Sequence, residues 1–310
     1  MKFFKDLNQS EKLEFFNSFD LVFCDCDGVI WQNLHDAIPG SADAVNHLIK
    51  LGKEIAFVTN NSIVPSEIQL EKFSKININI EKILKQKNNL SFEKIINDQH
   101  NLIHPARSIA DYLESLQFNG LILCFGSPPF KSYLEERGYQ LVQGCDGLVG
   151  NSIIELRNAI YSKEPVKAVI IDVEFNCTAW KLMRAQMHLN DPECLLIAGA
   201  ADPKVPFGPG AFIKILEEAT DRKALVLGKP GFGLKDILLQ KFNIEHKDRV
   251  LFIGDSLKSD IEFGKICGFQ TMLVLTGATK LKDLEQSIYQ NEESRPDIVV
   301  ESLKDIINLI

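Results

Sequence analysis

Short apolar runs recur along the chain, and several of them stop abruptly at a polar or glycine-containing cluster. Four such runs are Leu21–Cys24, Ile55–Val58, Ala224–Leu227 and Val250–Ile253. Runs of this length without polar alternation are typical of parallel strands that helices cover on both faces. Segments with apolar residues at helical spacing, such as Ser41–Leu51, lie between the runs. The pattern therefore predicts an α/β fold built on a doubly wound parallel sheet.

The alternation of strands and helices restarts in the middle of the chain. The predicted elements there are strands Leu121–Phe125, Gln140–Val142, Val166–Val173 and Cys194–Ala198, and helices Phe130–Arg137, Ser152–Tyr161 and Thr178–Leu189. A chain of 310 residues is expected to form about two domains. Because the four polar clusters flank this block, we expect residues 118–205 to be an inserted domain, with 1–117 and 206–310 forming the core. Residues Ile76–His100 show little periodicity and are predicted to be a surface excursion.

Composition narrows the function classes. A net charge of −8 and a pI near 5.4 argue against nucleic acid as a partner, because nucleic-acid binding needs a basic stripe. No apolar stretch reaches the roughly 20 residues of a membrane helix, and charges near Met1 interrupt any signal peptide. We therefore expect a cytoplasmic protein without a membrane partner. Four of the seven cysteines, Cys24, Cys124, Cys194 and Cys267, lie in or beside apolar strands and are predicted to be small buried thiols.

The polar clusters that follow the four runs are Asp25–Gly28, Thr59–Ser62, Gly228–Pro230 and Gly254–Ser256. In open α/β sheets, ligands bind beyond the carboxyl ends of the strands. We therefore expect all four clusters to meet at one edge of one sheet. Each cluster alone is weak evidence, because an acidic pair or a Thr-Asn pair after a strand is usually a turn or a helix cap. Their combination predicts a site for phosphoryl transfer.

The residue types suit the hydrolysis of a phosphate monoester. This reaction needs a nucleophile, a proton for the leaving group and positive charge on the phosphate oxygens. Asp25 suits the nucleophile and Asp27 the acid. With Asp255, these carboxylates would repel one another unless a hard cation joined them, so the sequence predicts a Mg²⁺ site. The groups that suit the phosphate oxygens are the Thr59 hydroxyl, the Asn60 backbone amide and the Lys229 ammonium.

Taken in order, the motifs DxDG, hhhTN, GKP and GDxxxxD resemble those of the haloacid dehalogenase superfamily of aspartyl-phosphate phosphatases. The stretches that look like the branch of phosphoglycolate, pyridoxal phosphate and 4-nitrophenyl phosphatases are Asp25–Trp31, Ile38–Gly40, Val58–Ser62 and Leu273–Gly277. The resemblance covers nearly the whole chain after about Ser18. It implies a Rossmann-like core, an α/β cap of type C2 inserted between the Thr and Lys motifs, Mg²⁺ dependence, and often a homodimer formed through the cap.

The resemblance also implies a role for each matching residue. Asp25 would be the nucleophile and a metal ligand, and Asp27 the acid and base and a metal ligand through its carbonyl. Asp255 would be a further metal ligand, and Asp260 a carboxylate that supports the ligands. The phosphate would bind to Thr59, Asn60, Asn61 and Lys229.

One loop departs from that branch. Where the branch has Thr-Asn-x-Asp and a longer loop, this chain has Gly199–Asp202 and a shortened Pro203–Gly208. We expect this loop to face the leaving group, with Asp202 and Lys204 as specificity residues. Since the loop differs, a glycolate-sized or pyridoxal-sized substrate cannot be carried over. The predicted substrate is a small phosphorylated metabolite, phosphoglycolate-like, with 4-nitrophenyl phosphate as a substrate in vitro.

Two other function classes stay open beside the phosphatase. A receiver-like phosphoacceptor also uses Asp, Thr and Lys at strand ends, but it is a much shorter single domain without a Gly-Asp-Ser motif after its Lys. A catalytically weak scaffold or binding protein could keep the fold and lose turnover. The intact Asp25, Asp27, Lys229 and Asp255 favour the enzyme.

Overall fold

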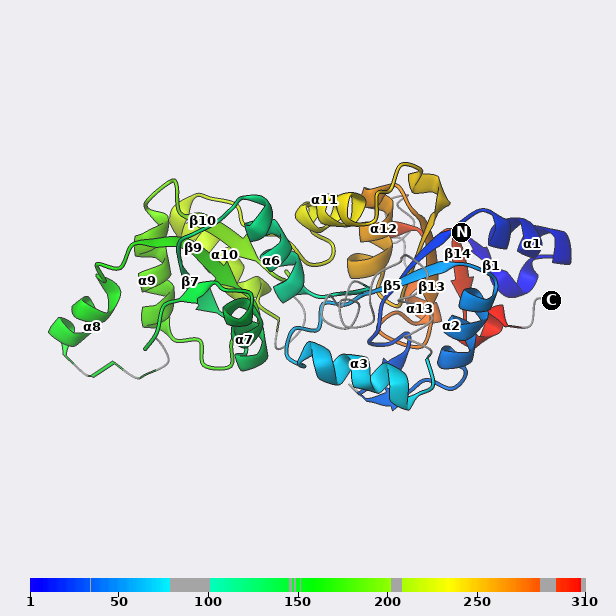
Figure 1. Ribbon diagram of the computed structural model, residues 1–310, viewed down its shortest axis with the longest axis horizontal. Helices are drawn as coiled ribbons and strands as arrows, with labels where there is room; N and C mark the ends of the chain where they lie inside the picture. The colour runs from blue at the N-terminus through cyan, green and yellow to red at the C-terminus, as the bar shows by residue number, and fades with distance from the viewer. Residues whose placement is uncertain are drawn as a thin grey trace. The chain divides into compact units, whose positions relative to one another are not determined.

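The computed structural model of the chain describes residues 1–33, 35–78, 101–144, 147, 149–150, 152–201, 208–284 and 294–307 (Figure 1). Inter-residue contacts divide it into two compact units. Unit 1 comprises Met1–Thr59, Ser66–Ile103 and Leu238–Ile310, and unit 2 comprises Asn60–Pro65 and His104–Ile237. Among the described helices, none combines the length and the apolar character needed to cross a membrane.

Unit 1 contains a seven-stranded sheet in which all neighbouring strands are parallel. Its strands, in spatial order, are β1 (Lys2–Phe3), β14 (Ile298–Val300), β13 (Gln270–Val274), β12 (Val250–Gly254), β2 (Leu21–Cys24), β5 (Glu54–Val58) and β6 (Leu102–Ile103). The chain builds outward from β2 in both directions, so the strand order reverses beside β2. That reversal is where open α/β sheets bind their ligands.

Helices cover both faces of this sheet, which explains why a central strand such as β2 is buried along its whole length. On one face, Val45 and Leu48 of α2 pack with Val22 and Ile253 of the sheet. The helical elements of unit 1 are α1 (Gln9–Asn17), α2 (Ser41–Lys50), α3 (Ser66–Lys75), a π-helix (Leu257–Ile261), α12 (Glu262–Cys267), α13 (Leu281–Leu284), and the 3₁₀ turns Phe4–Asp6, Lys247–Arg249 and Leu303–Ile306. A small antiparallel pair, β3 (Trp31–Gln32) and β4 (Asp36–Ala37), follows the first polar cluster.

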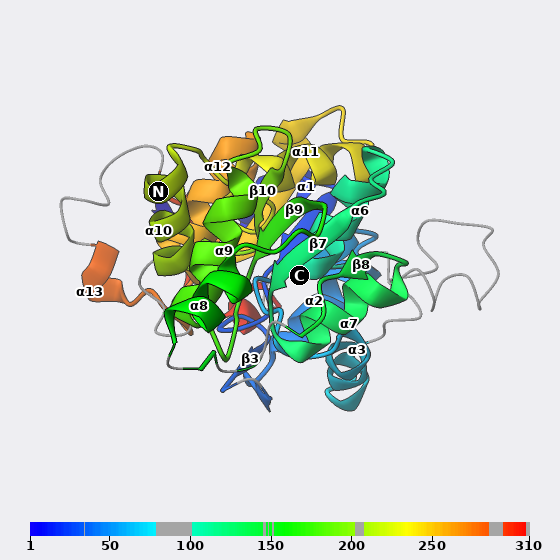
Figure 2. The same ribbon diagram turned by 90° about the vertical axis from the view of Figure 1, so that its left-hand side faces the viewer.

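Unit 2 contains a second, five-stranded sheet, which is also parallel throughout. Its strands, in spatial order, are β11 (Leu225–Val226), β10 (Leu195–Ala198), β9 (Val166–Ile171), β7 (Leu121–Phe125) and β8 (Gln140–Leu141). Its helices are α6 (Pro105–Ser115), α7 (Pro128–Glu136), α8 (Ile153–Ile160), α9 (Ala179–Leu189) and α10 (Gly210–Thr220). Figure 2 shows α6 and α7 on one side of the sheet and α9 and α10 on the other.

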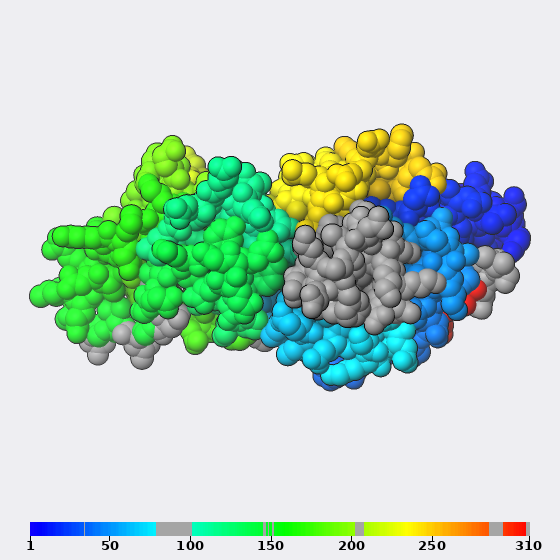
Figure 3. Space-filling model, in the orientation of Figure 1, coloured from blue at the N-terminus to red at the C-terminus, as the bar shows by residue number. Residues whose placement is uncertain are grey.

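Helix α8 differs from the other helices of unit 2 because none of its residues is buried. The helix lies at one end of this unit (Figure 1), where its side chains are at the surface (Figure 3), and Ile153 and Ile154 are 77% and 68% exposed. Helix α11 (Phe232–Lys241) carries the chain from unit 2 back to unit 1.

The structure confirms the predicted α/β class with parallel sheets, and the four cysteines predicted to be buried are buried. One placement was wrong. The run Ala224–Leu227 was expected in the core sheet, but β11 pairs with β10 in the sheet of unit 2. Apolar content alone cannot distinguish the two sheets, because both bury their strands. Unit 2 is also wider than the predicted insertion of residues 118–205, whose boundaries stay a prediction.

Candidate active site

Three aspartates form an acidic cluster in unit 1. Oxygen atoms of Asp25, Asp255 and Asp260 lie within 4.8 Å of one another, and all three residues are buried. The sheet explains the convergence, since Asp25 follows β2 and Asp255 follows β12, and these neighbouring strands pair in register at Cys24 and Ile253. The carboxyl ends of two central strands therefore bring the first two carboxylates together, as the sequence predicted.

Backbone amides hold the other carboxylates of the cluster. Asp260 Oδ2 accepts hydrogen bonds from the backbone N–H groups of Asp255 and Ser256, both at 3.0 Å. Asp255 Oδ2 accepts one from Ala278 N. Gly28, with a φ of +84°, leaves room for this carboxylate, because a Cβ at position 28 would collide with it. The loop after β13 thus contacts both acidic loops, since Ala278 binds Asp255 after β12 and the Thr276 hydroxyl donates to Gly28 O after β2.

Asp27 lies outside the acidic cluster, although the sequence placed its carboxylate there. Its Oδ1 accepts a hydrogen bond at 3.0 Å from the indole N–H of Trp31. The turn between them is closed by Gly28 N, which donates to Trp31 O at 2.7 Å. The third carboxylate of the cluster comes instead from Asp260, which was expected only to support the metal ligands.

The donor set of the acidic cluster fits a hard divalent cation. Three buried carboxylates this close would repel one another strongly in a low-dielectric interior, and a bound cation would remove that repulsion. Mg²⁺ prefers carboxylate and carbonyl oxygens, and protein sites usually supply only one or two carboxylates beside water and substrate. The residues present therefore meet the requirements of a magnesium site.

Thr59 lies at the end of β5, beside β2 in the same sheet. It is buried, with 3% of its surface exposed, and its backbone N–H donates to Ile103 O at 2.9 Å. Three of the four predicted clusters thus begin at neighbouring strands of unit 1, in the order β12, β2 and β5.

Asn60, Asn61 and Lys229 belong to unit 2. The Asn60 side chain holds the Lys229 backbone at two points: Lys229 N donates to Asn60 Oδ1, and Asn60 Nδ2 donates to Lys229 O, both at 2.9 Å. Asn61 Oδ1 accepts from Ile63 N and Val64 N at 3.3 Å, which closes a turn. The expectation that all four clusters share one sheet edge is therefore wrong for Lys229, which follows β11 of the other sheet.

A buried carboxylate that the sequence did not single out anchors this segment. Asp172, at the end of β9, is fully buried and accepts hydrogen bonds from the Ser62 hydroxyl, from Val173 N at 2.7 Å and from Ala200 N at 3.3 Å. Burial raises the pKa of Asp172 to about 6, while the three hydrogen bonds act in the opposite direction. Ser127 Oγ also donates to Ser62 O at 2.9 Å. A single acidic residue after a buried strand carries no signal in sequence, so it was missed.

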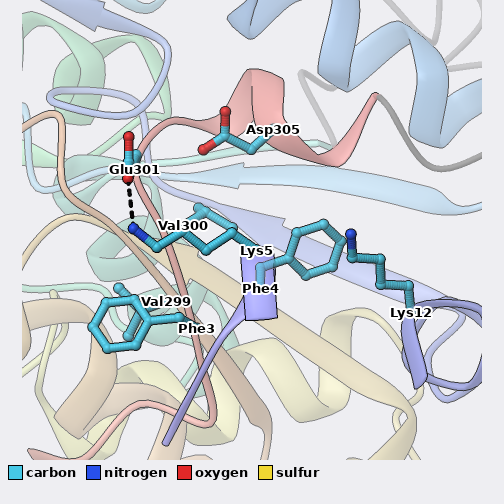
Figure 4. A pocket seen from close by; sticks show the side chains of 8 residues that line it. All are labelled: Phe3, Phe4, Lys5, Lys12, Val299, Val300, Glu301 and Asp305. Atoms are coloured by element: carbon cyan, nitrogen blue, oxygen red, sulfur yellow. Dashed lines mark hydrogen bonds and ion pairs between the residues drawn. The ribbon is translucent and has the colours of Figure 1, made fainter. Parts of the chain in front are cut away.

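Both predicted specificity residues, Asp202 and Lys204, and most of the Ile76–His100 excursion lie outside the described residues. A cavity of about 310 Å³ does open elsewhere in unit 1, at the carboxyl ends of β1 and β14 (Figure 4). There Lys5 is paired with Glu301 at 3.0 Å, and both side chains are mostly exposed. Lys12 Nζ lies 5.3 Å from the centre of the Phe4 ring. The cavity contains none of the predicted site residues.

Comparison with known proteins identifies the family of this chain. A family model described as haloacid dehalogenase-like hydrolase matches residues 22–140, and one described as HAD-hydrolase-like matches residues 226–306. The chain is 27% identical to glycerol-3-phosphate phosphatase of Homo sapiens over 93% of the chain and 90% of that protein. It is also 27% identical to chloroplastic phosphoglycolate phosphatase 1A of Arabidopsis thaliana, over 94% of this chain and 77% of that protein. The solved p-nitrophenyl phosphatase from Archaeoglobus fulgidus has a TM-score of 0.74 at 23% identity, covering 94% of this chain and 100% of that one.

The chain therefore belongs to the haloacid dehalogenase-like hydrolases. The relatives place it among the phosphatases of that family, which confirms the resemblance seen in the sequence motifs.

Proposed function

We propose that this chain is a Mg²⁺-dependent phosphomonoesterase that hydrolyses a small phosphorylated metabolite through an aspartyl-phosphate on Asp25. The observation that carries the proposal is the acidic cluster at the carboxyl ends of β2 and β12. Asp27, hydrogen-bonded in its own loop two residues after Asp25, supplies the second carboxyl group that the reaction needs.

In the first half of the reaction, an Asp25 carboxylate oxygen attacks the phosphorus atom and the bond from phosphorus to the leaving oxygen breaks. The Asp27 carboxyl group donates its proton to that oxygen, so the product alcohol leaves neutral. In the second half, Asp27, now ionised, takes a proton from a water molecule as the water attacks the phosphorus. The bond from phosphorus to Asp25 then breaks, and inorganic phosphate leaves.

Magnesium would be held by Asp25, by Asp255 and by the backbone carbonyl of Asp27, with Asp260 orienting the backbone of Asp255. When bound, the metal supplies positive charge that lets an anionic nucleophile approach an anionic phosphate. The chain itself supplies further groups for the phosphate oxygens. These are the Thr59 hydroxyl, the Asn60 backbone amide, Asn61 and the Lys229 ammonium, with the Asn60 side chain fixing the Lys229 backbone.

The names of the relatives support the substrate class that we propose. Two of them are named for phosphate esters of three-carbon and two-carbon metabolites, and a third for an aryl phosphate. We propose the same class for this chain, with glycerol 3-phosphate and phosphoglycolate as first candidates and 4-nitrophenyl phosphate as a test substrate. Asp202 and Lys204 are proposed to select among them.

A phosphate-release panel of these three esters, with Mg²⁺ and with a chelator, tests the proposal. The enzyme should release phosphate from at least one ester only when Mg²⁺ is present. Metal-dependent binding of an ester without turnover would favour the catalytically weak scaffold. Equal release in chelator would reject the metal assignment.

We also propose a homodimer formed through unit 2. Helix α8 supports this, because it presents Ile153 and Ile154 to solvent and buries none of its residues. Light scattering after size exclusion should give twice the 34.9 kDa chain mass, and Ile153→Glu with Ile154→Glu should return the protein to one chain mass. A monomeric wild type would reject this interface.

A further inference from the structure

We propose that Trp31 is a positioning residue that fixes which oxygen of Asp27 carries the catalytic proton. This inference rests on the proposed function, because it assigns a task to a neighbour of the proposed acid. The contact behind it is the hydrogen bond of 3.0 Å from the Trp31 indole N–H to Asp27 Oδ1.

Packing around the Trp31 ring holds its indole N–H in place beside Asp27. Trp31 is 2% exposed, and its ring centre lies 4.9 Å from that of Phe73, which in turn stacks on Phe57 at 4.1 Å. The ammonium group of Lys72, on α3, lies 4.9 Å from the centre of the Trp31 ring. Side chains of strand β5 and helix α3 therefore hold the indole in place.

The backbone between the two residues is fixed as well. Gly28 N donates to Trp31 O at 2.7 Å, and Trp31 N donates to Cys26 O at 3.2 Å. These bonds close a tight loop in which Asp27 and Trp31 also form a backbone bridge. These backbone bonds hold the Cα atoms of Asp27 and Trp31 close together, so the carboxyl group stays within reach of the indole N–H.

An indole N–H can only donate a hydrogen bond. The oxygen that it contacts must therefore accept, and in a protonated carboxyl group the carbonyl oxygen is a much better acceptor than the hydroxyl oxygen, so this contact favours the proton on the other oxygen. Trp31 thus places the acid proton of Asp27 on Oδ2. In the second half of the reaction, the same N–H stabilises the carboxylate that has to accept a proton from water.

This arrangement matters most when the leaving group is a poor one. An alkoxide leaves only when it is protonated, whereas 4-nitrophenolate leaves without help, so loss of proton donation slows alkyl phosphates selectively. General acid catalysis contributes roughly 10²-fold to 10⁴-fold, and Trp31→Phe should forfeit part of that contribution. We expect kcat/KM for glycerol 3-phosphate to fall about tenfold or more, and that for 4-nitrophenyl phosphate to fall less than about threefold.

The chain offers a matched control. It has two tryptophans, and the other, Trp180 of unit 2, is buried with an indole N–H that finds no hydrogen-bond acceptor among the described residues. Trp180→Phe should change the two substrates equally or not at all. If Trp31→Phe unfolds, benzothienylalanine at position 31 in the Trp180→Phe protein removes only the N–H, because sulfur replaces it in a ring of nearly the same shape.

Asp27→Asn and Asp25→Asn separate this inference from the proposed function. Asp27→Asn should show the same selectivity for leaving groups, only larger, and Asp25→Asn should be inactive on both substrates. If both hold but the Trp31 variants lose equally on the two substrates, or lose nothing, the positioning role is wrong while the proposed function stands. If Asp25→Asn keeps its activity, the proposed function fails first.

Discussion

The two sheets of this protein end in opposite kinds of acidic site. At the carboxyl ends of β2 and β12 in unit 1, three buried aspartates lie within 4.8 Å of one another. At the carboxyl end of β9 in unit 2, a single buried aspartate, Asp172, accepts hydrogen bonds from a hydroxyl and two backbone N–H groups. Both sites are buried, and both follow strands of a parallel sheet.

The difference between the two sites indicates what a buried carboxylate does in each of them. Carboxylates gathered against one another are costly, and they are retained where a cation and a reaction require them. A single carboxylate surrounded by neutral donors needs no cation, and here it attaches the segment that contains Ser62 to the sheet of unit 2. We therefore propose the acidic cluster as the site of chemistry and Asp172 as an anchor.

The largest expected effect comes from Asp25→Asn. The variant should lose phosphate release by about 10⁴-fold or more, because a covalent route through Asp25 has no substitute. The substitution is nearly isosteric, so the thermal unfolding midpoint should stay close to that of the wild type or rise as charge repulsion is removed. Residual turnover within about tenfold of wild type would reject the nucleophile.

The second largest effect is the loss of thermal stability on metal removal, which should depend on the acidic cluster and not on Asp172. Mg²⁺ at about 100 times its Kd should stabilise the wild type by roughly 2.7 kcal/mol, measured as a higher unfolding midpoint than in chelator. Asp255→Asn should lose most of this shift, and Asp172→Asn, the matched control in unit 2, should keep it. A shift that survives in Asp255→Asn would place the ion elsewhere. Ca²⁺ should inhibit turnover, because its larger, looser coordination shell misaligns Asp25.

The Asn60 side chain offers a smaller effect on activity. Asn60→Ala removes both hydrogen bonds to the Lys229 backbone. We expect kcat/KM to fall about tenfold to 100-fold, since displacing a phosphate-binding group by about 1 Å can cost that much. Lys229→Ala should cost more. An Asn60→Ala enzyme with unchanged kinetics would show that Lys229 is positioned by other contacts.

The smallest expected effect is the pH dependence that Asp172 gives to stability. Its pKa is about 6 in the folded chain, above the 3.8 usual for an aspartate, so the folded state binds this proton more tightly than the unfolded state does. The resulting stability is present at low pH and is lost as pH rises through about 6. The free energy of unfolding of Asp172→Asn relative to wild type should therefore rise by about 1 kcal/mol between pH 5 and pH 7.5. A difference that does not change with pH would contradict the raised pKa.

The sequence predicted the parts of the fold and site that depend on local patterns. The predicted bounds of the strand Leu121–Phe125 are those that the structure shows. Asp25 and Asp255 were correctly predicted to lie close together, because neighbouring parallel strands end at one edge of the sheet. Lys229 was assigned to the wrong sheet, because the choice of sheet for the two-residue strand β11 depends on pairing with β10. The contact of the Trp31 indole with Asp27 and the hydrogen bonds of Asp172 were not predicted, because the spacing of residue types along the sequence does not indicate such side-chain contacts.

The most direct test of the central claim is to look for the phosphoryl group on Asp25 itself. The enzyme is mixed with 4-nitrophenyl phosphate and Mg²⁺, quenched in acid within one turnover, digested and examined by mass spectrometry. If Asp25 is the nucleophile, the digest should contain a peptide phosphorylated on Asp25. This peptide should be present in Asp27→Asn, because the first step on this substrate needs little acid catalysis, and absent in Asp25→Asn. Turnover with no phosphorylated Asp25 peptide at any quench time, or a phosphoryl group on another residue, would contradict it.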